Sequence, residues 1–198
     1  MDYSVIIVGG GPAGLSAALY TARAGLSTAV LSASPGALAR AERIENYFGI
    51  SCSGPELLNR GRRQAEAAGV TFIEGEVLLT DGEPVPAALP PGVKCFTSPL
   101  AALSGQTELQ GVLLKDGTHL AVSGLFVAKG VAGAAELARR AGAETVQGNI
   151  SINTEGMTSL PGLFAAGDCT GGVLQVSVAV GEGAKAALSA IKYLKKTR

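Results

Sequence analysis

The sequence predicts an α/β fold with a central parallel sheet and a small antiparallel layer of three strands. The apolar run Val5–Val8 leads through a glycine-rich turn into an alanine-rich helix. A second apolar run, residues 27–31, follows where a right-handed crossover places the neighbouring parallel strand. Near the other end, the short apolar run 163–166 precedes a long helix at 176–194. Strands that alternate with helices in this way are typical of a parallel sheet covered by helices.

The glycine-rich turn carries the first functional signal. Gly9, Gly11 and Gly14 occupy the three positions of G-x-G-x-x-G, and Pro12 and Ala13 lie between them at the start of the helix. Gly9 permits the tight turn, Gly11 leaves no side chain between the backbone and a pyrophosphate, and Gly14 lets the helix pack closely on the strand. The free N–H groups and the dipole at this helix N-terminus favour an anion. These residues therefore predict a dinucleotide site.

Length and charge limit the other possibilities. The 198 residues fit a single domain, with a first half at 1–79, a proline-rich joint at 80–92 and a second half at 93–198. Sixteen basic and sixteen acidic residues give a net charge of zero, so we expect no nucleic-acid partner. Four cations, Lys192, Lys195, Lys196 and Arg198, end the last helix, either as complements to its dipole or as a docking patch.

Compartment and redox chemistry follow from what the sequence lacks. No apolar run reaches the roughly 18–20 residues of a membrane span, and Asp2 stands where a signal peptide has positive charge, so we expect a cytoplasmic protein without membrane contact. Cys52, Cys95 and Cys169 form no C-x-x-C and have no zinc spacing. We therefore expect neither a disulfide scaffold nor a metal site.

The middle of the chain predicts the remaining elements. Ser53 has the features of a helix N-cap, with Glu56 three residues later, and the helix is expected to run to about Ala68 before a strand at 70–73. The antiparallel layer is predicted from strands at 94–96, 109–115 and 120–128, the last two joined by a turn at Asp116 and Gly117. A helix at 134–141 and a strand at 149–153 complete the pattern.

A second constellation follows the strand at 163–166. Gly167 lets the chain turn closely, and Asp168 is left at the carboxyl end of the strand, where ligands bind in open α/β sheets. The Asp168 carboxylate can accept hydrogen bonds from sugar or ribityl hydroxyls. It can equally cap the helix that follows.

Together the glycine-rich turn and the segment around Asp168 resemble the FAD domain of the two-dinucleotide-binding-domain flavoproteins, in particular their thioredoxin reductase-like branch. The motifs that carry the resemblance are residues 8–14, 43–47, 53–57, 158–168 and the pair Gln175 and Val176. The resemblance implies a Rossmann-like FAD-binding domain with the pyrophosphate on the glycine turn. It also implies that Asp168 binds the ribityl chain beside Gly167, and that the flavin ring lies near Asn46 and the backbone of Gln175 and Val176.

The sequence departs from this family in three respects. It has a single G-x-G-x-x-G, so the NAD(P)H domain that such reductases insert between the halves of the FAD domain is expected to be absent. The C-x-x-C that this branch carries in that domain is missing too. Ser32 stands where many dinucleotide folds place the acid that binds ribose, and Ser32 and Ser34 remain as weaker ribose ligands.

These features predict an FAD-binding oxidoreductase that passes electrons to or from a separate partner through its exposed flavin. The partner would be ferredoxin-like, flavodoxin-like or another flavoprotein, and free NAD(P)H that binds transiently could also reduce the flavin. The resemblance implies a homodimer. The cofactor would carry the chemistry, and no side chain is singled out as catalytic. Two alternatives stay open: a non-enzymatic FAD module for sensing or storage, and a thiol-linked reductase that uses Cys169.

Overall fold

A central sheet of five parallel strands organises the molecule. The computed structural model describes residues 3–32, 36–74, 100–104, 111–121, 125–127 and 131–197. Across the sheet the strand order is β10-β7-β1-β2-β3, and every neighbouring pair is parallel. The strands are β1 (Val5–Val8), β2 (Thr28–Ser32), β3 (Thr71–Glu74), β7 (Leu125–Val127) and β10 (Leu163–Ala165). Because every pair is parallel, the carboxyl ends of all five strands lie at one edge of the sheet.

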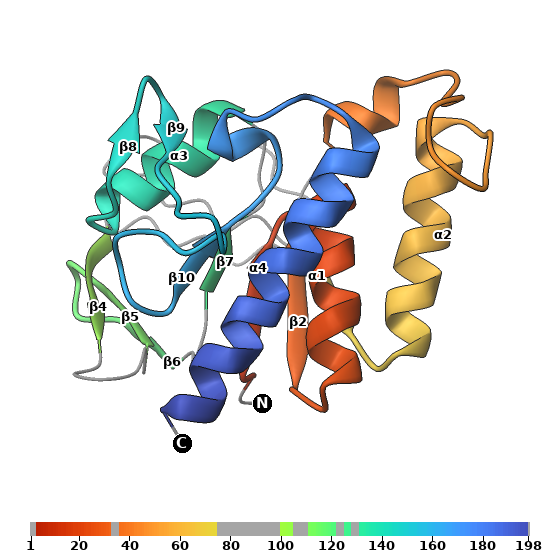
Figure 1. Cartoon of the computed structure of the whole chain (residues 1–198). Helices are drawn as coiled ribbons and strands as arrows, with labels where there is room; N and C mark the ends of the chain where they lie inside the picture. Colours follow the sequence, from red (N-terminus) through yellow and green to blue (C-terminus); the bar gives the residue numbers. More distant parts are fainter. Residues whose placement is uncertain are drawn as a thin grey trace.

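Helices α1 (Pro12–Arg23) and α4 (Val176–Lys196) lie side by side over the sheet (Figure 1). The approach is close because α4 has a glycine at the contact. A Cβ on Gly183 would overlap the carbonyl group of Ala13. The Ser16 hydroxyl also donates to the Val180 carbonyl at 2.8 Å. Small residues of both helices thus form the core against β1, and the start of α4 is fixed relative to the start of α1.

Helix α2 (Gly54–Ala67) packs on the other side of α1 (Figure 1). Its predicted cap is confirmed, since the Ser53 side chain accepts a hydrogen bond from the Glu56 N–H at 3.3 Å. A 3₁₀ turn, Ala37–Arg40, precedes α2 in the chain and contacts it. Gly54 meets the Leu38 carbonyl so closely that no side chain would fit there.

The antiparallel layer is present, but its strands differ from the predicted ones. It consists of β4 (Leu100–Ser104), β5 (Gly111–Leu114) and β6 (His119–Ala121), with the predicted turn between β5 and β6. The Thr118 N–H donates to the Asp116 side chain at 2.8 Å, and Gly117 has φ +86°. The predicted strand at 94–96 and the joint at 80–92 lie outside the described residues.

The prediction of one strand at 120–128 was wrong. Its first part belongs to β6, whereas Leu125–Val127 forms β7 and lies between β1 and β10 in the central sheet. Both parts are short and apolar, and hydrophobic periodicity does not tell to which sheet such a segment belongs.

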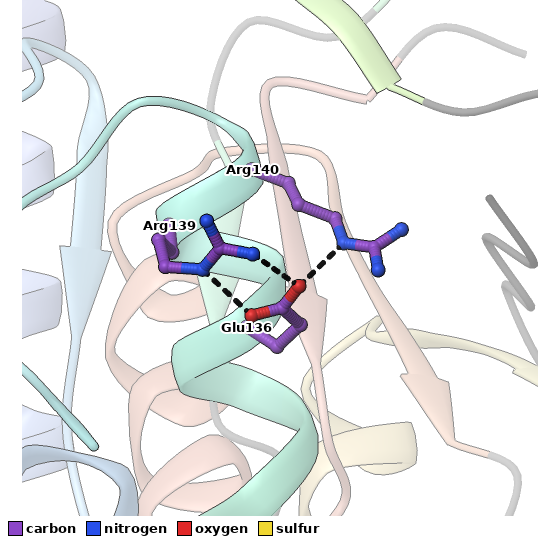
Figure 2. A network of polar contacts seen from close by, with 3 residues as sticks. All are labelled: Glu136, Arg139 and Arg140. Atoms are coloured by element: carbon purple, nitrogen blue, oxygen red, sulfur yellow. Dashed lines mark hydrogen bonds and ion pairs between the residues drawn. The ribbon is translucent and has the colours of Figure 1, made fainter.

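The second half of the chain has its own small core. Helix α3 (Val131–Arg140) packs on a hairpin of β8 (Thr145–Val146) and β9 (Asn149–Ile150), so the strand predicted at 149–153 is shorter and lies outside the central sheet. Ala134, Ala138, Ile150, Leu163 and Cys169 are among the buried residues of this cluster. Glu136, Arg139 and Arg140 form an ion-pair network on α3 (Figure 2).

In the part of the chain that the structure describes, none of the helices combines the length and the apolar character that crossing a membrane requires.

Candidate functional site

The glycine turn between β1 and α1 has the predicted geometry. Gly9 has φ +116°, a value that side chains disfavour, and its N–H donates to the Leu31 carbonyl of β2 at 2.8 Å. A Cβ on Gly14 would overlap the Gly9 carbonyl and lie 3.3 Å from Ile7 Cγ2 on β1. The absence of side chains at Gly9 and Gly14 therefore lets α1 begin directly against the end of β1.

The start of α1 is open to a ligand. Gly11 is the N-cap and offers no side chain to cap the helix, whose first turn contains no acidic residue. A Cβ on Gly11 would find no atom of the described residues within 4 Å. The first helical N–H groups thus face an open space without a competing carboxylate, as an anionic group at this place requires. Pro12 and Ala13 are the first two residues of this helix.

Ser32 lies beside the glycine turn, at the carboxyl end of β2. A Cβ on Gly10 would lie 2.9 Å from the Ser32 hydroxyl oxygen, so the glycine between the first two glycines of the motif makes room for this side chain. The position agrees with the predicted neighbourhood of a ribose. Ser34 falls outside the described residues.

The second turn begins where β10 ends. Gly167 has φ +82°, and Asp168 starts a single 3₁₀ turn, Asp168–Thr170. Asp168 is half-buried, and its carboxylate has no hydrogen-bond partner among the described residues. The alternative that Asp168 caps the following helix was wrong, because the N-cap of α4 is Gln175, seven positions further along the chain. The carboxylate is thus available to a ligand.

Sequence reasoning missed Glu182, which holds this second turn from α4. The Gly167 N–H donates to Glu182 Oε2 at 2.8 Å. The local sequence Gly181-Glu182-Gly183 does not single out this carboxylate, because the side-chain neighbours of a helical residue lie three and four positions away and not one. Its partner is fifteen residues away in sequence, so only the folded chain reveals the contact.

Two remote segments meet beside this turn. Asn46 Nδ2 donates to Gln175 Oε1 at 2.7 Å across 129 residues of sequence. Asn46 is placed by a short bridge, in which the Ile44 N–H donates to the Cys52 carbonyl at 2.8 Å. Gln175 immediately precedes Val176, the first residue of α4. The three positions predicted to border a flavin ring are thus brought together.

The surroundings of Cys169 argue against the thiol-linked alternative. The side chain is 1% exposed, and its Sγ lies 3.4 Å from the Ala166 carbonyl oxygen that accepts its hydrogen bond. Burial raises the pKa of the thiol to about 12, with smaller contributions from the Asp168 and Glu182 carboxylates. A buried, protonated thiol is a poor nucleophile at neutral pH.

Cys52 is partly exposed and free. Among the residues described, no three His, Cys, Asp or Glu side chains are grouped as metal ligands.

Two family models match the chain. A pyridine nucleotide-disulphide oxidoreductase model matches residues 91–183, and an FAD binding domain model matches residues 4–42. The thioredoxin reductase of Aquifex aeolicus is 51% identical over 83 residues, which are 40% of this chain and 26% of that protein. The chain therefore matches about a quarter of the length of that relative.

Solved structures show the same fold. The atypical thioredoxin reductase TRi of Desulfovibrio vulgaris Hildenborough aligns with a TM-score of 0.68 and 29% identity, over 98% of this chain and 99% of that chain. A ferredoxin-flavin thioredoxin reductase of Clostridium acetobutylicum aligns with a TM-score of 0.64 and 20% identity, over 98% and 99% of the two chains.

These comparisons confirm the predicted resemblance to thioredoxin reductase-like flavoproteins, the Rossmann-like fold and FAD as the cofactor. The residues present fit that cofactor. The open space at Gly11 and the uncapped start of α1 suit a pyrophosphate, and the free carboxylate of Asp168 suits a chain of hydroxyl groups.

Proposed function

We propose that this thioredoxin reductase-like chain is an FAD-dependent oxidoreductase of the cytoplasm that exchanges electrons with a separate redox protein through the exposed edge of its flavin. The observation that carries the proposal is the contact between Asn46 and Gln175, which joins the two segments expected at the flavin ring. Both residues are exposed, so a ring bordered by them would be accessible from solvent.

The chain's own residues would bind and orient the cofactor, which would supply the electron transfer itself. The backbone of the glycine turn would hold the pyrophosphate, and Asp168 would accept hydrogen bonds from the ribityl hydroxyls. The amides of Asn46 and Gln175 would border the ring. The proposed cofactor-binding residues are Gly9, Gly11, Pro12, Ala13, Gly14, Ser32, Ser34, Asn46, Gly167, Asp168, Gln175 and Val176.

Support for a separate partner comes from the surface beside these amides. Phe48 is 99% exposed, and Val173 and Leu174 are 68% and 65% exposed. Phe48 follows Asn46 by two residues, and Val173 and Leu174 directly precede Gln175, so the hydrogen bond between the amides links both apolar segments. We call these three side chains the apolar rim. Exposed apolar side chains beside a cofactor are typical of a docking surface.

The source of electrons is part of the proposal. The sequence contains one G-x-G-x-x-G and no C-x-x-C, so a ferredoxin-like protein or another flavoprotein would take the place of an inserted NAD(P)H domain.

A homodimer belongs to the same proposal, because the resemblance implies pairing through FAD domains. Light scattering of the eluted protein would measure the mass of the assembly, and a monomer at micromolar concentration would refute this part.

The first experiment is an anaerobic titration of the FAD-loaded chain, followed by the absorption band of oxidised flavin. We expect the band to persist with NADPH and NADH and to bleach with dithionite or a reduced ferredoxin. Stoichiometric bleaching by a pyridine nucleotide would overturn the proposal of partner dependence. A band that persists with reduced ferredoxin and with reduced flavoproteins, but bleaches with dithionite, would favour the sensing or storage alternative.

A variant pair tests the docking surface. Phe48→Ser removes the most exposed apolar side chain of the rim, whereas Leu188→Ser changes a 54% exposed leucine of α4 outside the rim. Reduction by ferredoxin is expected to slow about tenfold in Phe48→Ser only, since exposed hot-spot side chains contribute upward of about 1 kcal/mol to association. Reduction by dithionite should be equal in both. Equal ferredoxin rates would refute docking at the rim.

A further inference from the structure

We propose that Glu182 is a positioning residue for FAD, which fixes the turn at Gly167 and Asp168 so that the Asp168 carboxylate faces the cofactor. The inference rests on the FAD-binding role proposed above and adds a residue outside both sequence motifs.

The contact runs from the second turn of α4 to the backbone of the turn at Gly167. The Gly167 N–H donates to Glu182 Oε2 at 2.8 Å, and Gly167 has φ +82° and ψ −158°. The second carboxylate oxygen lies near the far end of the same loop, since a Cβ on Gly172 would be 3.0 Å from Glu182 Oε1. One carboxylate therefore lies against the loop both before and after the 3₁₀ turn that Asp168 begins.

The position of Glu182 is itself fixed by the helix packing. Gly183, the next residue, meets the Ala13 carbonyl group, and a Cβ on Gly167 would lie 3.0 Å from the Ala13 side chain. The start of α1, the turn at Gly167 and the second turn of α4 thus meet at Ala13. Glu182 connects the turn to this junction, so the distance between the pyrophosphate end and Asp168 depends on its side chain.

The chemistry of the contact favours positioning over simple packing. Within the described ranges Glu182 has no ion pair, and its hydrogen-bond donor is the Gly167 N–H. Among the described residues the Asp168 carboxylate accepts no hydrogen bond that would hold it in place, so the backbone conformation of Gly167 decides where this carboxylate lies. Without Glu182 only a fraction of the apoprotein would present Asp168 correctly, and the FAD affinity would be reduced to that fraction of its wild-type value.

The test measures FAD dissociation constants from the quenching of flavin fluorescence on titration with apoprotein. Glu182→Ala is expected to weaken binding about tenfold, whereas Glu182→Gln, which keeps an acceptor for the Gly167 N–H, should stay within about twofold of wild type. The matched control is Glu66→Ala, which removes an exposed carboxylate and its ion pair with Arg62 on α2 and should not change FAD binding.

A double variant separates positioning from loss of packing. If Glu182 acts through Asp168, Glu182→Ala should weaken binding by less than about twofold in an Asp168→Ala background. An equal tenfold loss in that background would overturn the proposal. Circular dichroism and urea unfolding of each apoprotein report whether it folds. Should Glu182→Ala not fold, Glu182→Met keeps the length of the side chain without the acceptor and enters the same comparison.

The outcomes distinguish this inference from the proposed function. Wild-type affinity in the folded Glu182→Ala variant overturns the positioning role and leaves the proposed function intact. A wild-type chain that takes up no FAD overturns both. A tenfold loss in the alanine variant, rescue by glutamine and no further loss in the Asp168→Ala background support the assignment.

Discussion

The two turns that border the candidate site are built in different ways. The turn at residues 9–14 presents only backbone to a ligand; Gly9 has a positive φ, and at Gly14 the Gly9 carbonyl occupies the place of a side chain. The turn at residues 167–175 depends on side chains, namely the carboxylate of Asp168, its support Glu182 and the Gln175 amide paired with Asn46. Substitution of the packed glycine of the first turn, Gly14, should thus damage binding and fold together, whereas substitution of the side chains of the second turn should weaken binding with the fold intact.

The largest effect is expected at Gly14. A Cβ there would overlap the Gly9 carbonyl, so Gly14→Ala must push α1 away from β1. Alanine gains about 1 kcal/mol in helix propensity, but overpacking against backbone costs about 1–3 kcal/mol or more. We expect the free energy of unfolding in urea to fall and FAD to be lost with it.

Gly181→Ala is the matched control for this substitution. It is also a glycine within a helix, and a Cβ there would meet nothing within 4 Å. It should raise the stability of the apoprotein by up to about 1 kcal/mol through helix propensity alone. Unchanged or higher stability of Gly14→Ala would contradict the close packing of the first turn.

Gly11 separates binding from folding within the first turn. Gly11→Ala places a methyl group in the open space at the start of α1, where nothing in the described chain lies within 4 Å. The apoprotein should lose no more than about 1 kcal/mol, since alanine is a poor N-cap. FAD affinity should fall at least about tenfold, because the methyl group would occupy the place proposed for the pyrophosphate. Isothermal titration and urea unfolding measure the two quantities, and an unchanged affinity would place the pyrophosphate elsewhere.

The difference between the turns also explains what the sequence could predict. The first turn is local, so its strand, glycine spacing and helix follow from residues 5–23 alone. The predicted elements that became β1, α1, α2, β10 and α4 are confirmed, and their ends differ from the predicted ones by at most two or three residues. The meeting of Asn46 with Gln175 was expected from the resemblance to a family, since the two segments are 129 residues apart.

Other features could not be read from the sequence. Glu182 was missed because its role is defined by one backbone N–H across a turn. β7 was assigned to the wrong sheet because the sequence of a short apolar strand does not indicate which strands it pairs with. The hairpin of β8 and β9 is held by a turn in which Gln147 has φ +51°, a conformation for which glutamine gives no signal.

The reactivity of the Cys169 thiol reports whether the second turn is as firmly packed as the first. A rise of its pKa from 9.0 to about 12 lowers the thiolate fraction at pH 8 about 1,000-fold. In the Cys52→Ser, Cys95→Ser variant, iodoacetamide should therefore leave the native chain unlabelled and label it after unfolding. Mass spectrometry reads the result, and rapid native labelling would show that the turn opens readily.

The same burial makes stability depend on pH. The unfolded chain releases the Cys169 proton near its ordinary pKa of 9.0, whereas the folded chain keeps it to about pH 12. Stability relative to Cys169→Ala should thus be highest below pH 9 and fall toward pH 12, by at most about 1.4 kcal/mol per pH unit. A constant difference between the two proteins from pH 8 to 11 would contradict the buried thiol.

The smallest effect is expected on the outer face of α3, whose inner face packs against Cys169. Glu136 accepts hydrogen bonds from Arg139 at 2.6 and 2.8 Å and from Arg140 at 2.7 Å, and these contacts lower its pKa from 4.5 to about 2 (Figure 2). The network stabilises the fold above pH 4.5, and its contribution is lost as the pH falls toward 2. Glu136→Gln should therefore unfold slightly earlier in urea than wild type at pH 7, with the difference vanishing near pH 2 and in high salt.

FAD affinity at pH 7 should not change in Glu136→Gln, because the network lies on the solvent side of α3 and the second turn is supported from its buried side. A weaker affinity would show that the charged face of α3 helps to place Asp168. The first turn would then be fixed by adjacent backbone alone. The second turn would be held by the whole cluster of buried residues around α3 and Cys169, and Glu182 would be one of several supports.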